Sequence, residues 1–197
     1  MLFNEFSNLF FSLPSPVILL EGSRSVEDAD REKLTALGAK LASAFPNIVF
    51  RSGNADGADS LFAEGILQVN PKQLELILPN DRKLKSTHGE RRISLEQLDK
   101  AELNQTCQLT KQATPINKPL IEFYEQGKQG SPRFKAQYLL RDALKVIGSE
   151  KLNFKPAAFG LFYLNSKKKT GGGTGHTIRV CELQNVPVVM QSDWLNW

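Results

Sequence analysis

Short, continuous apolar runs alternate with helical patterns in the first part of this chain, and this alternation restricts its fold more than any other feature. The runs have the length of buried strands and cover residues 17–20, 47–50 and 74–78. Helical spacing of leucines over 25–41 and an apolar stretch over 58–67 separate them. Strand, helix and strand in succession form a βαβ unit, whose strands run parallel. The sequence therefore predicts an α/β fold.

The second part of the chain continues the alternation. Apolar residues at helical spacing predict a helix over 133–147, and Gly148 ends it. Two further strands are predicted over 157–164 and 186–190, with a short helix over 176–183 between them. The whole pattern predicts a mostly parallel sheet of five or more strands. Helices are expected on both faces of that sheet.

The stretch between the third and fourth predicted strands is less regular. From residue 80 to 131 the apolar periodicity weakens, although 88–103 fits a helix. We expect this stretch to be an inserted lid or loop region, since a long irregular connection is usually functional. The chain length of 197 residues favours one domain over 1–197 that carries this insertion.

The amino-acid composition excludes several classes of protein function. The 25 Lys and Arg residues exceed the 21 Asp and Glu residues by four, which favours an anionic ligand but is too little for a dedicated nucleic-acid binder. Two cysteines and two histidines, far apart in sequence, indicate neither a disulfide framework nor a metal site. No stretch approaches the roughly 18 apolar residues of a membrane span. The start carries Glu5 and lacks the basic residues of a signal peptide, so we expect a cytoplasmic protein without a membrane partner.

Three loops follow predicted strands, where ligands bind in open parallel sheets. The first is Gly22, Ser23 and Arg24. Glycine lets the backbone approach a ligand, and a guanidinium binds phosphate through two hydrogen bonds. The alternative is a tight turn with a solvated arginine.

The second loop runs from Ser52 and Gly53 to Asp59. Asp56 is a candidate N-cap of the next helix, with Asp59 as the acidic residue of its first turn. The alternative is that these carboxylates accept hydrogen bonds from ribose hydroxyls, as acidic residues do in dinucleotide sites. Both interpretations stay open, because one side chain can do both.

The third loop is a glycine run between a predicted buried strand and a helix. Its candidate ligand-binding residues are Gly171, Gly172, Gly173, Thr174, Gly175, His176 and Thr177. Successive backbone N–H groups at the positive end of a helix bind phosphate. The motif lacks the Gly-Lys-Ser/Thr ending of a P-loop. A flexible surface turn is the alternative, and the lysines at 167–169 either add positive field here or are simply solvated.

These three motifs, in this order, resemble the SLOG superfamily, which contains the Lonely Guy phosphoribohydrolases and the Smf/DprA proteins. The resemblance covers about residues 17–190. It implies a Rossmann-like, three-layer fold with a nucleotide-type ligand between the loops. In the Lonely Guy enzymes an Arg-Lys pair and a glutamate carry glycosidic hydrolysis, and Arg141 and Glu182 are the nearest matches. Asp142 replaces the lysine, and Glu182 follows Gly175 by seven residues instead of four.

The main interpretation is a protein that binds a nucleotide or nucleotide derivative, with phosphate on residues 171–177, and that acts as a ligand sensor. One alternative is an N-glycosidic hydrolase of a nucleoside monophosphate or NAD-like substrate, with Glu182 and Arg141 as catalytic residues. Another is a single-stranded nucleic-acid binder. The expected partner is a small molecule and not a nucleic acid, with no further cofactor or metal. Trp194 and Trp197 either form a contact between copies of the chain or cover the sheet edge.

Overall fold

The computed structural model describes residues 3–8, 13, 15–165 and 172–197. Within this part of the chain the strands form one parallel sheet of six, in the order β4-β3-β2-β1-β5-β6. They are β1 (Val17–Gly22), β2 (Val49–Ser52), β3 (Leu74–Leu78), β4 (Arg91–Ser94), β5 (Phe159–Tyr163) and β6 (Val188–Met190). The predicted α/β class and parallel sheet are confirmed. The strand order reverses between β1 and β5, because the chain adds β2 to β4 on one side of β1 and β5 and β6 on the other.

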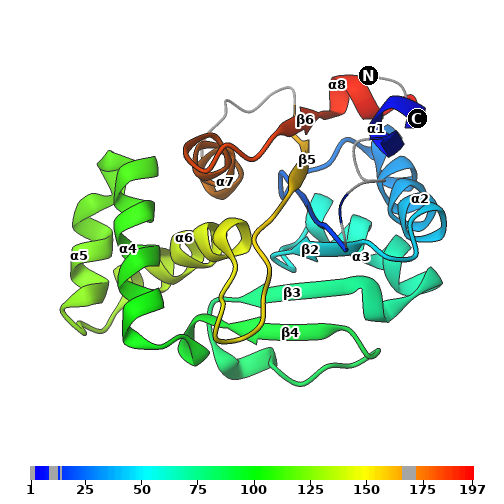
Figure 1. Cartoon of the computed structure of the whole chain (residues 1–197). Helices are drawn as coiled ribbons and strands as arrows, with labels where there is room; N and C mark the ends of the chain where they lie inside the picture. Colours follow the sequence, from blue (N-terminus) through cyan, green and yellow to red (C-terminus); the bar gives the residue numbers. More distant parts are fainter. Residues whose placement is uncertain (1–2, 9–12, 14, 166–171) are drawn as a thin grey trace.

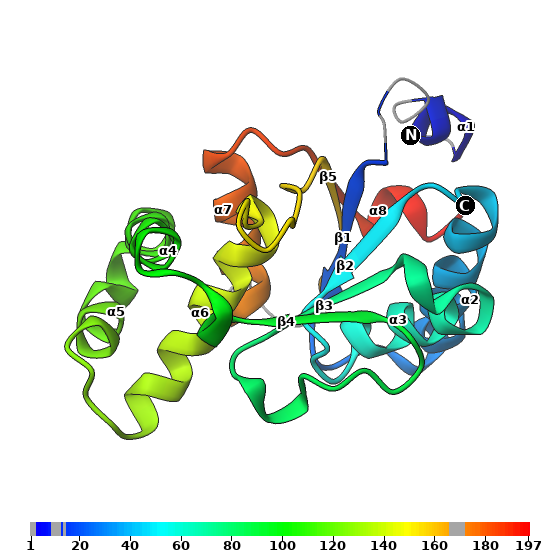
Figure 2. The ribbon, with the colours of Figure 1, turned by 60° about the horizontal axis from the view of Figure 1, so that its bottom comes forward.

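Helices cover both faces of the sheet, which gives the three layers of a Rossmann-like fold (Figures 1 and 2). On one face lie α2 (Asp28–Ala44) and α3 (Ala58–Val69), and on the other lie α6 (Ser131–Ile147) and α7 (Gly172–Leu183). Two more helices, α4 (Lys100–Ala113) and α5 (Lys118–Glu125), pack against α6 and extend the layer away from the sheet.

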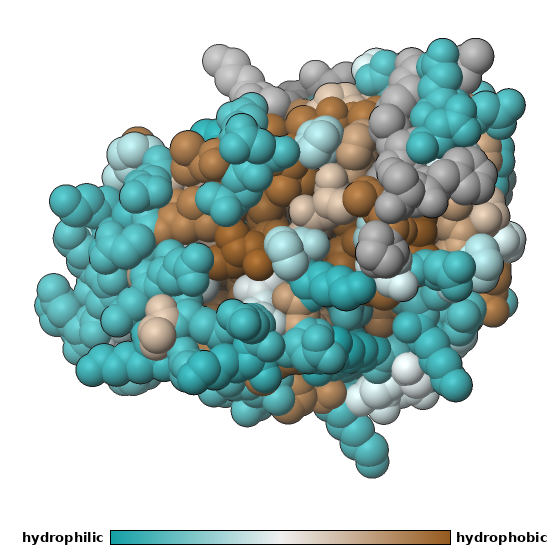
Figure 3. Space-filling model, viewed as in Figure 1, coloured by the Kyte–Doolittle hydropathy of each residue, from teal (hydrophilic) through white to brown (hydrophobic). Residues whose placement is uncertain are grey.

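The apolar side chains of β1 divide between the two faces of the sheet. Ile18 and Leu20 belong to the core that includes residues of α2 and α3, whereas Leu19 belongs to the core that includes residues of α6 and α7. Successive side chains of a strand point to opposite faces, so a strand covered on both faces is apolar without interruption. Over α6 and α7 the molecule shows an apolar area (Figure 3), where Ile147 and Ile178 are partly buried.

Helix ends follow the sequence signals only in part. The N-cap residue of α2 is Glu27, which forms no side-chain cap bond, so the helix begins three residues after the start of the predicted range 25–41. The acidic residues Asp28 and Asp30 in the first turn favour this helix end through the helix dipole. Gly148 follows α6 with a φ of 70°, a conformation that glycine adopts without strain, and so ends the helix as predicted.

The stretch 80–131 is more ordered than its weak periodicity predicts. The expected helix over 88–103 is wrong, because Arg91–Ser94 forms the edge strand β4 and the helix begins only at Lys100. Asp99 caps α4 by accepting a hydrogen bond from the backbone N–H of Glu102. An edge strand has one unpaired side and tolerates charged side chains, which hides it from an apolar pattern. Its role as a lid stays a prediction.

The two ends of the chain pack on the same core. Trp194 on α8 (Gln191–Trp194) is buried, with its ring centroid 5.5 Å from that of Phe62. The ring of Trp197 lies 4.5 Å from that of Phe6 on α1 (Phe3–Asn8). Both tryptophans therefore have contacts within the chain. Among the described helices, none is long and apolar enough to cross a membrane.

Candidate functional site

A cavity of about 950 Å³ opens beside the carboxyl end of β1, where the strand order reverses. Ligands of open parallel sheets bind at such a reversal. The lining comes from the loops after β1 and β2, the start of α3, one side of α6, the start of α7 and the connection between α4 and α5. Segments that are far apart in sequence thus converge on one site.

Five buried charged side chains, Glu21, Asp59, Arg141, Asp142 and Lys145, line the cavity, and we call them the charged floor. The Nζ atom of Lys145 lies 2.5 Å from Oε1 of Glu21 and 2.8 Å from Oδ1 of Asp142. Arg141 donates to the same Asp142 oxygen from Nε at 3.2 Å and from Nη2 at 2.8 Å. The floor thus holds three carboxyl groups and two cations.

Burial and mutual charge set the protonation of the floor. Desolvation raises the pKa of Glu21 to about 7, against the opposing effect of Lys145. Burial alone would also raise the pKa of Asp142, but Lys145 and Arg141 outweigh it and lower the pKa to about 2. Near neutral pH, Asp142 is therefore ionised, while Glu21 lies close to the midpoint of its titration.

Asp59 joins the loops that follow β1 and β2. Its Oδ1 accepts a hydrogen bond from the backbone N–H of Gly22 at 3.0 Å, and its Oδ2 accepts one from Gly53 at 3.2 Å. Each carboxylate oxygen thus has one backbone partner, and the role of Asp59 as a ribose acceptor stays a prediction. The N-cap of α3 is Gly57 and not Asp56, which is exposed and does not line the cavity.

The loop after β1 reaches the cavity as predicted, since Gly22, Ser23 and Arg24 all line it. A Cβ at Gly22 would lie 2.4 Å from the carbonyl oxygen of Tyr163, so only glycine fits between β1 and β5 here. The guanidinium of Arg24 lies 5.9 Å from the ring centroid of Tyr138 on α6. Arg24 and Tyr138 are therefore neighbours in the lining of the cavity.

The loop after β2 contacts Arg141 of the charged floor. Ser52 and Gly53 are buried and do not line the cavity, whereas Ala55 does. The carbonyl oxygen of Gly53 accepts a hydrogen bond from Nη1 of Arg141 at 2.9 Å. A Cβ at Gly53 would lie 2.8 Å from the Arg141 guanidinium carbon, so this glycine makes room for the arginine and not for a ligand.

The glycine run supplies part of the wall. Gly171 lies outside the described residues, while Gly172, Gly173 and Thr174 begin α7 and line the cavity. Gly172 has a φ of 68°, where glycine is favoured. The hydroxyl of Thr174 donates to the carbonyl oxygen of Gly22 at 2.9 Å, so it ties α7 to the first loop.

The rest of the run points into the protein. Gly175, His176 and Thr177 are buried and do not line the cavity. The predicted contact of His176 with a ligand is wrong in this structure, because its Nδ1 lies 2.8 Å from the Thr114 hydroxyl inside the fold. Desolvation lowers the pKa of His176 to about 4, so the ring is neutral at pH 7. Thr177 bonds to the carbonyl oxygen of Gly173.

The two candidate catalytic residues separate in space. Arg141 belongs to the charged floor, but Glu182 is exposed on α7 and does not line the cavity. The carboxyl groups that do line it are those of Glu21, Asp59 and Asp142. The structure therefore gives Glu182 no route to a ligand in this cavity.

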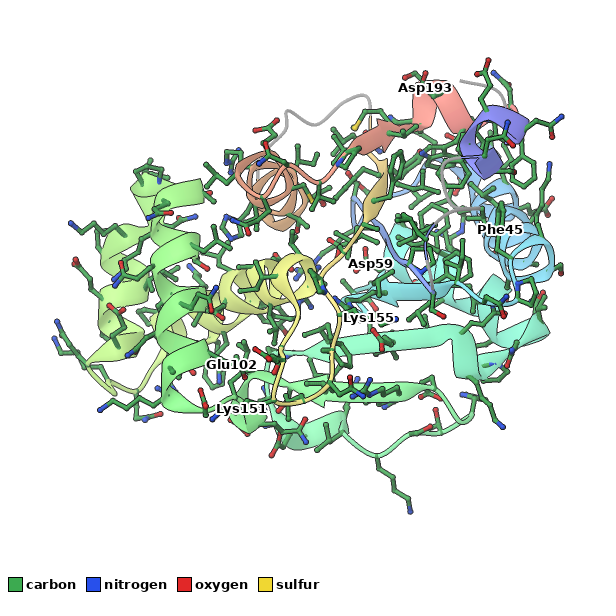
Figure 4. All side chains as sticks on the ribbon, viewed as in Figure 1. Phe45, Asp59, Glu102, Lys151, Lys155 and Asp193 are labelled. Atoms are coloured by element: carbon green, nitrogen blue, oxygen red, sulfur yellow. The ribbon has the colours of Figure 1, made fainter. Side chains whose placement is uncertain are left out.

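Sequence reasoning missed Glu21 and Lys145. Glu21 ends the apolar run of β1, and Lys145 follows Asp142 by three residues in an apolar helix. A charged residue at the carboxyl end of a buried parallel strand is the signal that indicates Glu21. The spacing of Asp142 and Lys145 places them on one side of α6, as their ion pair shows. Asp59, from the first turn of α3, lies in the interior of the molecule, to the side of α6 (Figure 4).

Above the floor, the cavity has an apolar wall and a cationic rim. The wall consists of Ile116, Leu120, Tyr138 and Leu139. The rim consists of Arg24, Lys135 and Arg179, none of which forms an ion pair with a described carboxylate. Metal ligands do not cluster here, since the described residues contain no group of three His, Cys, Asp or Glu side chains suited to a metal ion.

Two aromatic side chains of α6 are exposed, and each lies near an arginine from another segment. Phe134 is 47% exposed and Tyr138 is 42% exposed. The guanidinium of Arg82 lies 6.0 Å from the ring centroid of Phe134, and that of Arg24 lies near Tyr138. We call Phe134 and Tyr138 the exposed aromatic pair.

The chain was compared with family models, curated proteins and solved structures. No family model and no curated protein matches the sequence. Among solved structures, the chain is similar to DNA processing protein A from Helicobacter pylori, described by its single-stranded DNA binding mode. The identity is 16% and the TM-score 0.45, over 90% of this chain and 65% of that one. This chain therefore spans less than two thirds of the length of the protein that it matches.

The matched protein is described as binding single-stranded DNA, so the comparison runs against the expectation that nucleic acid is not a partner, and that expectation is withdrawn. At this identity the likeness concerns the fold and not what the cavity of this chain binds.

Proposed function

We propose that the cavity binds a nucleotide-type ligand. The observation that carries the proposal is the convergence, at the strand-order reversal, of a cationic rim, the start of α7 and an apolar wall in one cavity of about 950 Å³. This volume lies at the upper end of the range for sites that take a small molecule or a cofactor. A nucleotide carries an anionic group, a polar sugar and a flat apolar base, and the three parts of the cavity match these.

The charges of the lining favour an anion. The lining contains five cationic and three acidic side chains, a formal excess of two positive charges. The excess lies on the rim, because the charged floor pairs its two cations internally. The first amides of α7 add the positive end of a helix dipole. A phosphate is therefore expected between Arg24 and the start of α7.

The apolar wall suits the base. Tyr138 and Leu139 come from α6, and Ile116 and Leu120 come from the connection between α4 and α5 and from α5 itself. Aromatic rings stack on flat nucleobases, and surrounding aliphatic groups exclude water from the contact. Asn117 lies in the same lining and offers an amide for the polar edge of a base.

Gly173→Ala tests the proposal. The added Cβ would lie 2.8 Å from Oδ2 of Asp142 and so close the space between α7 and the floor. Alanine favours a helix more than glycine does, so the fold is expected to be retained. Isothermal titration calorimetry with the four common ribonucleoside 5′-diphosphates should show binding to the wild-type protein. We expect at least about tenfold weaker binding to the variant.

The matched control is Gly89→Ala, since a Cβ at Gly89 meets nothing within 4 Å and Gly89 lies outside the cavity. This variant should bind as the wild type does. Binding that is unchanged in Gly173→Ala, or no binding of any diphosphate to the wild type, would contradict the proposed site.

A second candidate is binding of single-stranded nucleic acid, favoured by the exposed aromatic pair on α6. Stacking on exposed rings beside cations is how single strands bind without sequence preference. Phe134 and Tyr138 are four residues apart on α6, and arginines from two other segments lie near their rings. Tyr138 also lines the cavity, so a strand on this face would pass its mouth.

The salt dependence of oligonucleotide binding separates this candidate from the first. A fluorescent 12-nucleotide thymidine strand should lose affinity steeply between 50 and 200 mM salt if its phosphates contact the rim. Phe134→Ala together with Tyr138→Ala should weaken binding by about tenfold or more, whereas Tyr138→Phe should retain it. An affinity that changes neither with salt nor with loss of the two rings rules out this surface.

A further inference from the structure

We infer that Asp142 accepts hydrogen bonds from the sugar hydroxyls of the ligand and so makes the cavity selective for ribonucleotides. The inference rests on the proposed function and specifies the ligand class. It assigns a binding role to a side chain that the sequence comparison marked only as a departure from the Arg-Lys pair.

The two oxygens of Asp142 have different surroundings. Oδ1 receives the hydrogen bonds of Arg141 and lies 2.8 Å from Nζ of Lys145. Among the described residues, none donates a hydrogen bond to Oδ2, which lies close to the start of α7, where a Cβ on Gly173 would be 2.8 Å from it. Asp142 and Gly173 both line the cavity, and we therefore assign Oδ2, the oxygen that Arg141 and Lys145 leave free, to the ligand.

The charge state of Asp142 decides which ligand group fits there. Arg141 and Lys145 hold this carboxyl group in its ionised form at neutral pH. An ionised carboxylate only accepts hydrogen bonds, and it repels a phosphate oxygen. The group beside Oδ2 is therefore a donor, and the hydroxyls of ribose are the donors that every ribonucleotide carries. Acidic residues bind ribose hydroxyls in other nucleotide sites of parallel sheets.

The position of Asp142 on α6 agrees with this assignment. Tyr138 precedes Asp142 by four residues, so the two side chains lie about one helical turn, or roughly 5.4 Å, apart along the same side of α6. This spacing approximates the distance between the base and the sugar of one nucleoside. A base against Tyr138 would place its sugar near Asp142 and leave the phosphate for the rim and the start of α7.

The charged floor keeps Asp142 in place. Its two cationic neighbours come from α6 itself, and Arg141 is held by the Gly53 carbonyl oxygen while Lys145 is held by Glu21. A carboxylate fixed in this way loses little side-chain freedom when a ligand binds, which favours discrimination between similar ligands. The oxygen that faces the cavity is thus positioned before the ligand arrives.

The test compares ribonucleoside 5′-diphosphates with their 2′,3′-dideoxy counterparts by calorimetry on the wild-type protein. We expect the dideoxy compounds to bind at least about tenfold more weakly, because the carboxylate oxygen would face no donor. Asp142→Asn should reduce this ratio to about threefold or less. Glu32→Gln, which removes an exposed carboxylate on the opposite face of the sheet, should leave the ratio unchanged.

The outcomes distinguish this inference from the proposed function. Equal affinity for the ribo and dideoxy compounds would overturn the role of Asp142 and leave nucleotide binding in place. No binding of either set would contradict both. If Asp142→Asn does not fold, the ratio of ribo to dideoxy affinity on the wild-type protein still tests the role of Asp142. Gly173→Ala, whose methyl group covers Oδ2 without changing its charge, then takes the place of Asp142→Asn and should also lower this ratio.

Discussion

Replacing Lys145 by methionine is expected to lower the free energy of unfolding by about 3–5 kcal/mol at pH 7.5. Lys145 is buried between Glu21 and Asp142, and both ion-pair distances are short. Methionine has a similar length but no charge, so the variant keeps much of the volume and leaves two carboxyl groups facing each other. Removing one partner of a buried pair costs more than the pair contributes, because the remaining charge is left without compensation.

Urea unfolding of the purified variant measures this effect. The double variant Lys145→Met with Glu21→Gln should recover part of the loss, since it removes one of the two uncompensated carboxyl groups. Lys151→Met is the control, because Lys151 is an exposed lysine on a loop and should leave the unfolding midpoint close to wild type. A loss below about 1 kcal/mol in Lys145→Met would mean that the floor is not the buried network described above.

The second large effect is a pH dependence that comes from Glu21. Its pKa is about 7 in the folded protein against 4.5 for the free side chain. Between these values the folded state holds a proton that the unfolded state has released, so Glu21 lowers stability as the pH rises from about 4.5 to 7. At roughly 1.4 kcal/mol per pKa unit, the loss is on the order of 3 kcal/mol.

Glu21→Gln isolates this contribution. His176, with its pKa lowered to about 4, opposes Glu21 because it destabilises the fold as the pH falls from 6.5 to 4, but it does so equally in both proteins. The free energy of unfolding of Glu21→Gln minus that of the wild type should therefore rise between pH 5 and 8. A difference that stays flat or falls over this range would show that Glu21 is not protonated near neutral pH.

The sheet could be predicted from sequence to the extent that its strands are buried on both faces. The strands β1, β3 and β5 are mainly apolar, whereas β2 begins with Val49 and Phe50 and ends with the buried polar residues Arg51 and Ser52. The edge strand β4 has the sequence Arg-Arg-Ile-Ser, and only its second half is buried. An edge strand needs no apolar run, so periodicity assigned this segment to a helix.

The place of the site could be predicted, but not the role of each residue in it. Parallel strands bring the loops after β1 and β2 to one edge of the sheet, and the start of α7 joins them there. Asp59 looked like a cap or a ribose ligand, yet both its oxygens hold backbone amides. His176 looked like a phosphate ligand, yet it turns inward to Thr114. Which way a helical side chain points depends on tertiary packing, which local sequence does not contain.

The charged floor was the least predictable part. Arg141 and Asp142 are adjacent in sequence, and a regular helix directs neighbours to different sides. Both are nevertheless buried, because the guanidinium reaches the Gly53 carbonyl while also bonding to Asp142. Glu21, the ion-pair partner of Lys145, comes from a strand 124 positions earlier in the chain. Pairings of this kind depend on the fold and leave no local pattern.

We expect a nucleotide to bind where β1, α6 and the start of α7 meet. Titration of the ¹⁵N-labelled protein with adenosine 5′-diphosphate, followed by heteronuclear NMR, tests it most directly. The account predicts saturable shifts of the backbone amides of Gly22, Ser23, Gly173 and Thr174, with smaller changes on α2, which covers the other face of the sheet. Saturable shifts confined to residues outside this cavity would contradict the account.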